Sequence, residues 1–505
     1  MKDKIIFWNH TDFIQLGLAK SLLDKHDCEL YAIMDVADTP KKFFKEQQIV
    51  KFEKIWFYHD HIKKSNNKPD LQYLASFENK YGINLWQLAY NERIFFRYND
   101  YYQFNNDEIL SILEQECKLF ENIIDEIKPD FLMTPMTTFH HNHLFYELCK
   151  AKGVKILMFI PTRLKQRVMI TNNPDKFDIL SKKIKHEKDR NIEELQDYLK
   201  NQTTSKDTKQ VTSSFLTSKS KLLKAAIEFL FISKNTNLKT HYTYYGRTKY
   251  RVLKNSLSDL IKKKYRGYFI DKTFLRETLD EKFILYPLLT EPERSLLLAA
   301  PYYTDQLKVI SDIAQSIPTG YKLYVKEHPA QLVRDWRKIS FYKQIMSMPN
   351  VRLIHPSAST SDIIKKCSLI ITIGGTIGFE AAFFEKATIS FIETIYSELK
   401  SVYAIRSVTE LPKLIQKCLE HNFDARDLSR FIEYLEQNSI EFPWVKLDME
   451  AHGRFFHGGF LIDTDIEPQK VVSYLNEFRT NFDELAIEHL KKIKQYKESE
   501  NVTSQ

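Results

Sequence analysis

The sequence predicts an α/β protein with two Rossmann-like domains, a cleft between them and a basic helical insertion. In two separate parts of the chain, apolar runs of strand length alternate with amphipathic runs of helical length, which is typical of parallel sheets covered by helices. The 505 residues, 43% of them hydrophobic, suffice for two cores. We expect domains at 1–180 and 276–435, the insertion at 181–275, and C-terminal helices at 436–505 that could pack back across the junction.

The first half opens with the strand KIIFWN, the helix FIQLGLAKSLLDK and the strand CELYAIMD. Farther along, the strand DFLMTP, the helix HLFYELCKAKG and the strand VKILMFIP repeat this order. Open α/β sheets bind ligands at the carboxyl ends of their strands. His10 and Asp12 follow the first strand and are therefore candidate catalytic residues, as a general base.

Three histidines, His140, His141 and His143, follow DFLMTP and are the alternative source of a base. The pattern HHNH has neither zinc-like spacing nor a carboxylate beside it, so we predict no metal site. The five cysteines are scattered and never form a CxxC pair, which predicts reduced thiols and argues against a zinc ribbon. No cofactor is expected.

The sharpest motif in the second half is SLIITIGGTIGFEAAFFEK. A buried strand ends at a Gly374-Gly375 turn, Thr376 can cap the helix that follows, and Glu380 lies one turn inside that helix. Free N–H groups at such a helix start suit a phosphate, and Glu380 could accept hydrogen bonds from ribose hydroxyls. The alternative is a glycine turn and a capped helix without a ligand.

A second motif, YKLYVKEHPAQ, ends a strand with Lys326, Glu327 and His328 at its carboxyl edge. A lysine and a proton-donating histidine suit a departing nucleotide phosphate, because charge develops on the leaving oxygen. We take His328 and Glu327 as candidate catalytic residues and Lys326 as a binding residue. Considered alone, the His-Pro pair is more often only a turn.

Two weaker motifs complete the set. YPLLTEPERS carries Glu291 after a strand, and VRLIHPSAST carries Ser357 before a helix. Both are candidate substrate-binding residues. The alternatives are a solvated charged loop for Glu291 and helix capping for the serines.

Together, YPLLTEPE, YKLYVKEHP, VRLIHPSAST and GGTIGFEAAFFEKATISF resemble the capsule polysaccharide synthesis family, glycosyltransferases of GT-B architecture related to enzymes that use CMP-activated acidic sugars. The resemblance covers roughly residues 283–393. It implies that His328 contacts the donor phosphate with Lys326 beside it, and that Gly375, Thr376 and Glu380 bind the nucleotide. The family usually has Gln-Pro where this chain has Glu291-Pro292, which puts the role of that position in doubt.

The predicted insertion has a polar middle and a basic end. Residues 219–266 contain thirteen Lys and Arg against two acids, with aromatic residues between them. This composition suits an anionic membrane surface, and the alternative is a pair of helices with solvated lysine faces. No nucleic-acid module accompanies the charges, so no nucleic acid is expected.

No apolar run approaches the roughly 18 residues of a membrane span, and the start lacks the apolar core of a secretory signal. We expect a cytoplasmic protein, peripheral on the inner face of the membrane. The resemblance implies transfer from a nucleotide-sugar donor, CMP-sugar favoured, to a glycan or glycolipid acceptor of a surface polysaccharide. The alternatives are a sugar-nucleotide epimerase or polyol-phosphate transferase of the same fold, and a non-catalytic basic scaffold.

Overall fold

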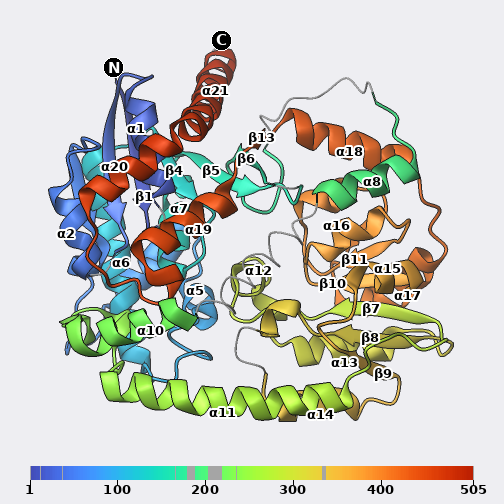
Figure 1. The fold of residues 1–505 in the computed structure, drawn as a ribbon. Coiled ribbons are helices and arrows are strands. Elements are labelled where there is room, and N and C mark those ends of the chain that lie inside the picture. The colour runs from blue at the N-terminus through green and yellow to red at the C-terminus, as the bar shows by residue number, and fades with distance from the viewer. Residues whose placement is uncertain are drawn as a thin grey trace.

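The protein contains two α/β units that lie side by side (Figure 1). The computed structural model describes residues 2–11, 13–36, 38–164, 166–178, 188–202, 219–234, 236–332 and 337–503. Each unit is built on its own sheet of mainly parallel strands, so the predicted class of two Rossmann-like α/β sheets is confirmed. Asp12 and residues 181–187 and 203–218 of the polar middle of the predicted insertion lie outside the described residues, whereas residues 192–202 within that middle form a helix.

The first sheet has seven strands in the order β13-β6-β5-β4-β1-β2-β3. They are β1 (Asp3–Asn9), β2 (Cys28–Met34), β3 (Lys54–Phe57), β4 (Phe131–Pro135), β5 (Lys155–Pro161), β6 (Arg167–Thr171) and β13 (Ile440–Glu441). β1 to β5 are parallel, whereas β6 and β13 run antiparallel to their neighbours. The sequence predicted a parallel sheet, but the link from β5 to β6 is too short for a crossover helix, so β6 must return alongside β5.

Alternating side chains of β1 enter two different cores. Ile6 and Trp8 pack under α6 and α7, whereas Ile5 and Phe7 pack under α1 and the C-terminal helices. The helices of this unit are α1 (Ile14–Leu23), α2 (Asp38–Glu46), α3 (Tyr58–His61), α4 (Leu71–Tyr81), α5 (Leu85–Asn91), α6 (Asn106–Ile127), α7 (His140–Ala151), α19 (Trp444–Phe455), η8 (His457–Gly459), α20 (Pro468–Glu477) and α21 (Arg479–Thr503). The last four come from the end of the chain, so both termini lie on the first unit (Figure 1).

The second sheet has six strands in the order β12-β11-β10-β7-β8-β9, all parallel. They are β7 (Phe283–Pro287), β8 (Lys322–Lys326), β9 (Val351–Ile354), β10 (Leu369–Thr372), β11 (Thr388–Ser390) and β12 (Val402–Ala404). Because β7 lies between β8 and β10, the loops that follow these three strands emerge at the same edge.

Helices cover both faces of the second sheet. They are α8 (Ile192–Gln202), α12 (Arg294–Leu297), α13 (Gln306–Ser316), α14 (Ile339–Met346), α15 (Thr360–Lys366), α16 (Ile377–Ala382), α17 (Leu411–Leu419) and α18 (Ala425–Gln437). Short helical turns lie between them at η4 (Pro301–Tyr303), η5 (Pro329–Leu332), η6 (Ile395–Glu398) and η7 (Val408–Glu410).

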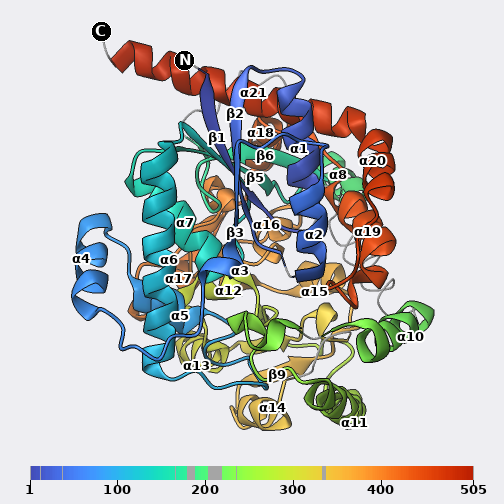
Figure 2. The ribbon, with the colours of Figure 1, turned by 90° about the vertical axis from the view of Figure 1, so that its left-hand side faces the viewer.

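The basic segment forms the underside of the molecule in Figures 1 and 2. It comprises α10 (Lys219–Ile227), η1 (Glu228–Ile232), η2 (Thr236–Leu238), η3 (Tyr242–Tyr244) and the long helix α11 (Lys249–Thr273). α11 begins beside the first unit, where Arg251 donates to the Tyr101 carbonyl, and ends with Ile270 in the core of the second. Among the described residues, no helix is both long and apolar enough to cross a bilayer.

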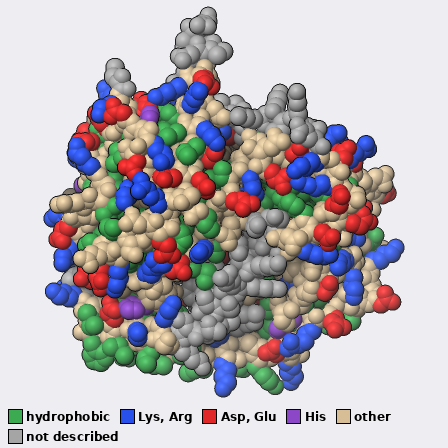
Figure 3. Space-filling model, turned by 45° about the horizontal axis from the view of Figure 1, so that its top comes forward, with side chains coloured by type: hydrophobic (Ala, Val, Ile, Leu, Met, Phe, Trp, Pro, Cys, Tyr) green, Lys and Arg blue, Asp and Glu red, His purple; other side chains and the backbone are tan. Residues whose placement is uncertain are grey.

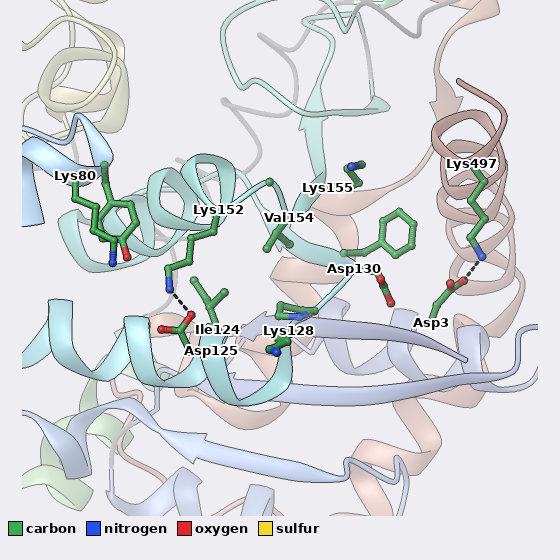
Figure 4. A pocket seen from close by; sticks show the side chains of 14 residues that line it. Asp3, Lys80, Ile124, Asp125, Lys128, Asp130, Lys152, Val154, Lys155 and Lys497 are labelled. Carbon is green, nitrogen blue, oxygen red and sulfur yellow. Dashed lines mark hydrogen bonds and ion pairs between the residues drawn. The ribbon is translucent and has the colours of Figure 1, made fainter. Parts of the chain in front are cut away.

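A cavity of about 520 Å³ lies at the amino ends of β1, β4 and β5 (Figure 4). Lysines and aspartates line it, and two of the lysines pair with aspartates of the lining, Lys152 with Asp125 and Lys497 with Asp3. This is the edge of the sheet opposite to the one where open α/β folds bind their ligands.

Candidate functional site

The carboxyl edges of the two sheets meet at the junction between the units. Arg163, in the turn after β5, donates to the Thr376 hydroxyl after β10 at 3.3 Å. Nearby, Arg294 of α12 makes a two-point ion pair with Asp175 of the first unit, at 3.0 and 2.9 Å. The loops in which the sequence placed its donor-site residues therefore face the first unit.

The glycine turn after β10 is shaped by close packing. Gly374 has a φ of +149°, and a Cβ there would lie 2.8 Å from the Ile392 side chain. The Thr372 hydroxyl accepts the Gly375 amide at 3.0 Å, and the Tyr396 hydroxyl donates to the Gly375 carbonyl at 2.6 Å. A side chain at Gly374 would therefore clash and strain the backbone.

Thr376 stands at the start of α16, as predicted, but its side chain does not cap the helix. Its hydroxyl accepts from Arg163 instead. Burial lowers the pKa of the half-buried Arg163 guanidinium, and Asp175 and Glu293 lie near enough to favour its charge without forming an ion pair with it among the described residues. A desolvated cation without a direct ion pair is suited to an anionic ligand.

Glu380 lies one turn into α16, where its amide donates to the Thr376 carbonyl. Burial raises the pKa of its carboxyl group from 4.5 to about 7. The carboxyl group has no hydrogen-bond or ion-pair partner among the described residues. A desolvated, unpaired carboxyl group is a signal of a functional site.

Lys326 ends β8 and is 3% exposed. Its ammonium group donates to the Pro356 carbonyl at 3.3 Å, and burial lowers its pKa to about 8. In the same loop, the Ser357 hydroxyl lies 2.5 Å from Nδ1 of His355. Ser359 rather than Ser357 caps α15, by accepting the amide of Asp362.

Glu327 is fully buried and points away from solvent. Its carboxylate accepts from the Arg337 guanidinium and from the Tyr342 hydroxyl, the latter at 2.6 Å. Arg337 also donates to the Leu289 carbonyl after β7. This geometry gives Glu327 a positioning role between two loops, in place of the catalytic role that the sequence predicted.

His328 is half-buried, and its Nδ1 accepts the Ala330 amide at 3.1 Å. That bond leaves Nε2 as the protonated nitrogen in the neutral imidazole.

Glu291 lies at the same edge and accepts from Gln306 at 2.6 Å and from Tyr98 of the first unit at 3.4 Å. These contacts place Glu291 at the junction, where the resemblance had expected a glutamine.

At the carboxyl edge of the first sheet, Asp35 contacts three histidines: His141 at 2.7 Å, His59 at 3.1 Å and His10 at 3.4 Å. Burial alone would raise the pKa of Asp35, but the charge of His141 and the hydrogen bonds from these histidines hold it well below its usual range. The His10 side chain is 21% exposed, more than the other two. Asp35 and His10 thus form a pair in which a carboxylate orients an accessible imidazole.

Beside this pair, His140 is buried between Glu92 at 2.7 Å and Glu116 at 2.9 Å. Burial opposes its protonation, yet the charge of Glu116 and the hydrogen bonds of both carboxylates raise its pKa to about 10. The sequence-based premise that no carboxylate lies near these histidines is therefore wrong. Glu116, His140 and His141 could group around a metal, but a protonated His140 is a hydrogen-bond donor and not a ligand.

Sequence reasoning missed Arg163 and Asp35. Both follow predicted strands, so the rule that selected His10 could have selected them. Arg337 follows no predicted strand, so nothing in the sequence marked it as the partner of Glu327.

Residues 188–399 match the family model of capsule polysaccharide biosynthesis proteins, which confirms the family resemblance of the motifs. No curated protein matches the chain significantly. Solved structures with some likeness include the UDP-GlcNAc 2-epimerase of Methanocaldococcus jannaschii, with 13% identity over 86% of this chain and 100% of that one and a TM-score of 0.24. S. aureus MnaA with UDP has 12% identity over 90% and 96%, TM-score 0.26. The β-Kdo 2,7 transferase KpsC of Thermosulfurimonas dismutans has 12% identity over 62% and 79%, TM-score 0.30. These scores are too low to support a conclusion about activity.

Glu327→Gln is expected to destabilise the protein by about 3 kcal/mol, because it removes the closer of the two carboxylates beside the buried Arg337 charge and leaves only Glu291, at 3.8 Å. Tyr342→Phe, which removes only a hydrogen bond to the same carboxylate, is expected to cost about 1 kcal/mol. Urea unfolding monitored by tryptophan fluorescence measures both. Unchanged stability in Glu327→Gln together with lost activity would contradict the positioning role.

Proposed function

We propose that this chain, which belongs to the capsule polysaccharide biosynthesis family through residues 188–399, is a GT-B glycosyltransferase that moves a sugar from a nucleotide-activated donor to a surface or capsular polysaccharide. The observation that carries the proposal is the contact between Arg163 and Thr376. It joins a cation of the first unit, which has no direct ion pair among the described residues, to the glycine turn of the second, at the edge where ligands of open α/β sheets bind.

The donor site in this proposal has four parts. Arg163 binds an anionic group of the donor, and the Gly374–Thr376 turn lets the donor approach the backbone closely. Glu380 accepts hydrogen bonds from ribose hydroxyls. His328 donates a hydrogen bond from Nε2–H to the phosphate oxygen on which charge develops as the bond breaks, with the positive charge of Lys326 behind it and Ser357 beside it. A CMP-sugar is the favoured donor.

The acceptor base in this proposal is His10. Asp35 orients its imidazole and would stabilise the imidazolium that forms when the acceptor hydroxyl loses its proton. The acceptor is a glycan or glycolipid, and residues 219–266 bring a cytoplasmic, peripheral enzyme to the anionic membrane surface that carries it.

His328→Ala is expected to lower kcat by about 10²–10³-fold with little change in donor affinity, because it removes a hydrogen-bond donor whose interaction strengthens as charge develops on the leaving phosphate. Arg163→Gln is expected to weaken donor binding about 10–100-fold, because it removes a charge-assisted hydrogen bond to the anionic group of the donor. Calorimetry with CMP, UDP and GDP, followed by transfer assays with the sugar donor of the nucleotide that binds, separates the two effects.

The matched controls for these two variants are His421→Ala and Arg479→Gln, which lie away from the junction. Full activity of His328→Ala would overturn its assignment. Conversion of the donor without any acceptor would replace the transferase with an epimerase, and failure to bind any nucleotide together with salt-sensitive binding to polyanions would favour a scaffold.

Donor affinity is expected to fall as the pH drops through about 7, since protonation of Glu380 removes an acceptor of the ribose hydroxyls. The carboxyl group is ionised above this pH and neutral below it, so the loss lies on the acidic side. Glu380→Gln should bind more weakly and show no such pH dependence, whereas Glu385→Gln in the same motif should keep it. A titration of nucleotide affinity from pH 5.5 to 8.5 makes the comparison, and retained pH dependence in Glu380→Gln would exclude this role.

His10→Gln is expected to lower kcat about 10²-fold or more while leaving nucleotide binding unchanged, because the base acts on the acceptor. His61→Gln, an exposed histidine of α3 in the same unit, is the matched control. Steady-state kinetics with saturating donor measures the difference. Equal kcat in the two variants would move the base to another residue.

A further inference from the structure

The long helix α11 carries its apolar residues on the outside of the protein. The side chains that share its outer face are 39–74% exposed: Tyr250, Leu253, Leu257, Ile261, Tyr265 and Tyr268. They recur every three or four residues, which places them in one stripe on an α-helix. A surface helix of a soluble protein normally buries its apolar face and exposes its polar face to water.

The inner face of α11 is correspondingly polar. Asn255, Asp259, Lys263 and Arg266 are half-buried against the body of the protein, and of the whole helix only Ile270 is fully buried. The helix is therefore amphipathic but inverted, with its apolar face outward and its polar face toward the protein. The helix is 25 residues long, and its apolar stripe, from Tyr250 to Tyr268, extends about 27 Å at the rise of an α-helix.

α10 and η1 add to the same side of the molecule. Leu223, Phe231 and Ile232 are 63%, 81% and 68% exposed. The Lys249 ammonium group donates to the Leu230 carbonyl at 2.8 Å, which holds η1 against the start of α11. Both ribbon views place α10 and α11 on the underside, and hydrophobic side chains gather along the lower left edge in Figure 3.

An apolar area of this extent marks an interaction surface, because single exposed apolar residues are common but contiguous ones are not. Its borders identify the partner. Exposed cations flank the stripe at Arg251, Lys254, Lys262 and Lys264. The one acid of α11 before its last turn, Asp259, pairs with Lys262 at 3.3 Å, so the border of the stripe stays positive overall. A second copy of the chain would bring like charges together, whereas an anionic bilayer neutralises them.

We propose that the α10–η1–α11 surface is an interfacial membrane-binding surface, whose apolar stripe inserts among the headgroups and acyl chains of an anionic bilayer while the flanking Lys and Arg bind lipid phosphates. The inference deepens the membrane association of the proposed function. Because α11 begins at the first unit and ends in the second, the bilayer contacts the helix that connects the two halves of the site.

Flotation of the full chain with vesicles tests the surface without any assay of transfer. The protein is expected to float with vesicles of phosphatidylcholine and 30% phosphatidylglycerol, and not with phosphatidylcholine alone. Leu257→Ser/Ile261→Ser should weaken binding at least tenfold by removing inserted area, and Lys262→Gln/Lys264→Gln about fivefold for each charge. Leu71→Ser, an apolar residue of α4 that is 61% exposed, should bind like the unchanged protein.

Vesicle binding that is unchanged in Leu257→Ser/Ile261→Ser would overturn insertion. A concentration-dependent dimer that this variant abolishes in the absence of lipid, seen by sedimentation velocity, would assign the stripe to a second copy instead. Nucleotide binding by the same variants separates the two proposals, since it should be unaffected whether or not the membrane surface is real.

Discussion

The buried ion pair between Glu327 and Arg337 is the interaction on which the shape of the proposed donor site depends. Arg337 reaches the Leu289 carbonyl and lies 3.8 Å from Glu291, so it ties the loop after β8 to the loop after β7. Neither charge is exposed, and each is tolerated only because the other is present. Because this pair holds Glu327, the residue before His328, the loop keeps its shape in the absence of a ligand.

The proposed donor site and the proposed base have different electrostatic environments. Around the glycine turn, Arg163 of the first unit and Glu380 of the second are desolvated, and neither forms a direct ion pair among the described residues. On the side of the first sheet, the Asp35 and His140 groups are neutralised within their own networks. Ionisable groups without an ion pair favour a charged ligand, which suits the donor site. Groups paired within a network keep their side chains oriented, which suits the base.

The inverted helix α11 relates this site to the surroundings of the protein. Its inner face packs on both units, and no described residue covers its apolar stripe. An external partner would remove these side chains from water. A bilayer that does so would lie along the underside of both units and thereby fix how the junction is presented to an acceptor embedded in that bilayer.

The sequence by itself determined the two sheets and most of their strands, because buried strands and amphipathic helices leave periodic patterns that need no partner to be recognised. It also located the loops of Lys326–His328 and Gly374–Glu380 at strand ends. Only the tertiary structure decided that Glu327 is locked by Arg337, that Arg163 reaches Thr376, that carboxylates surround His140, and that the apolar stripe of α11 faces outward. Periodicity reports which residues share a face, whereas contacts between distant segments determine what that face meets.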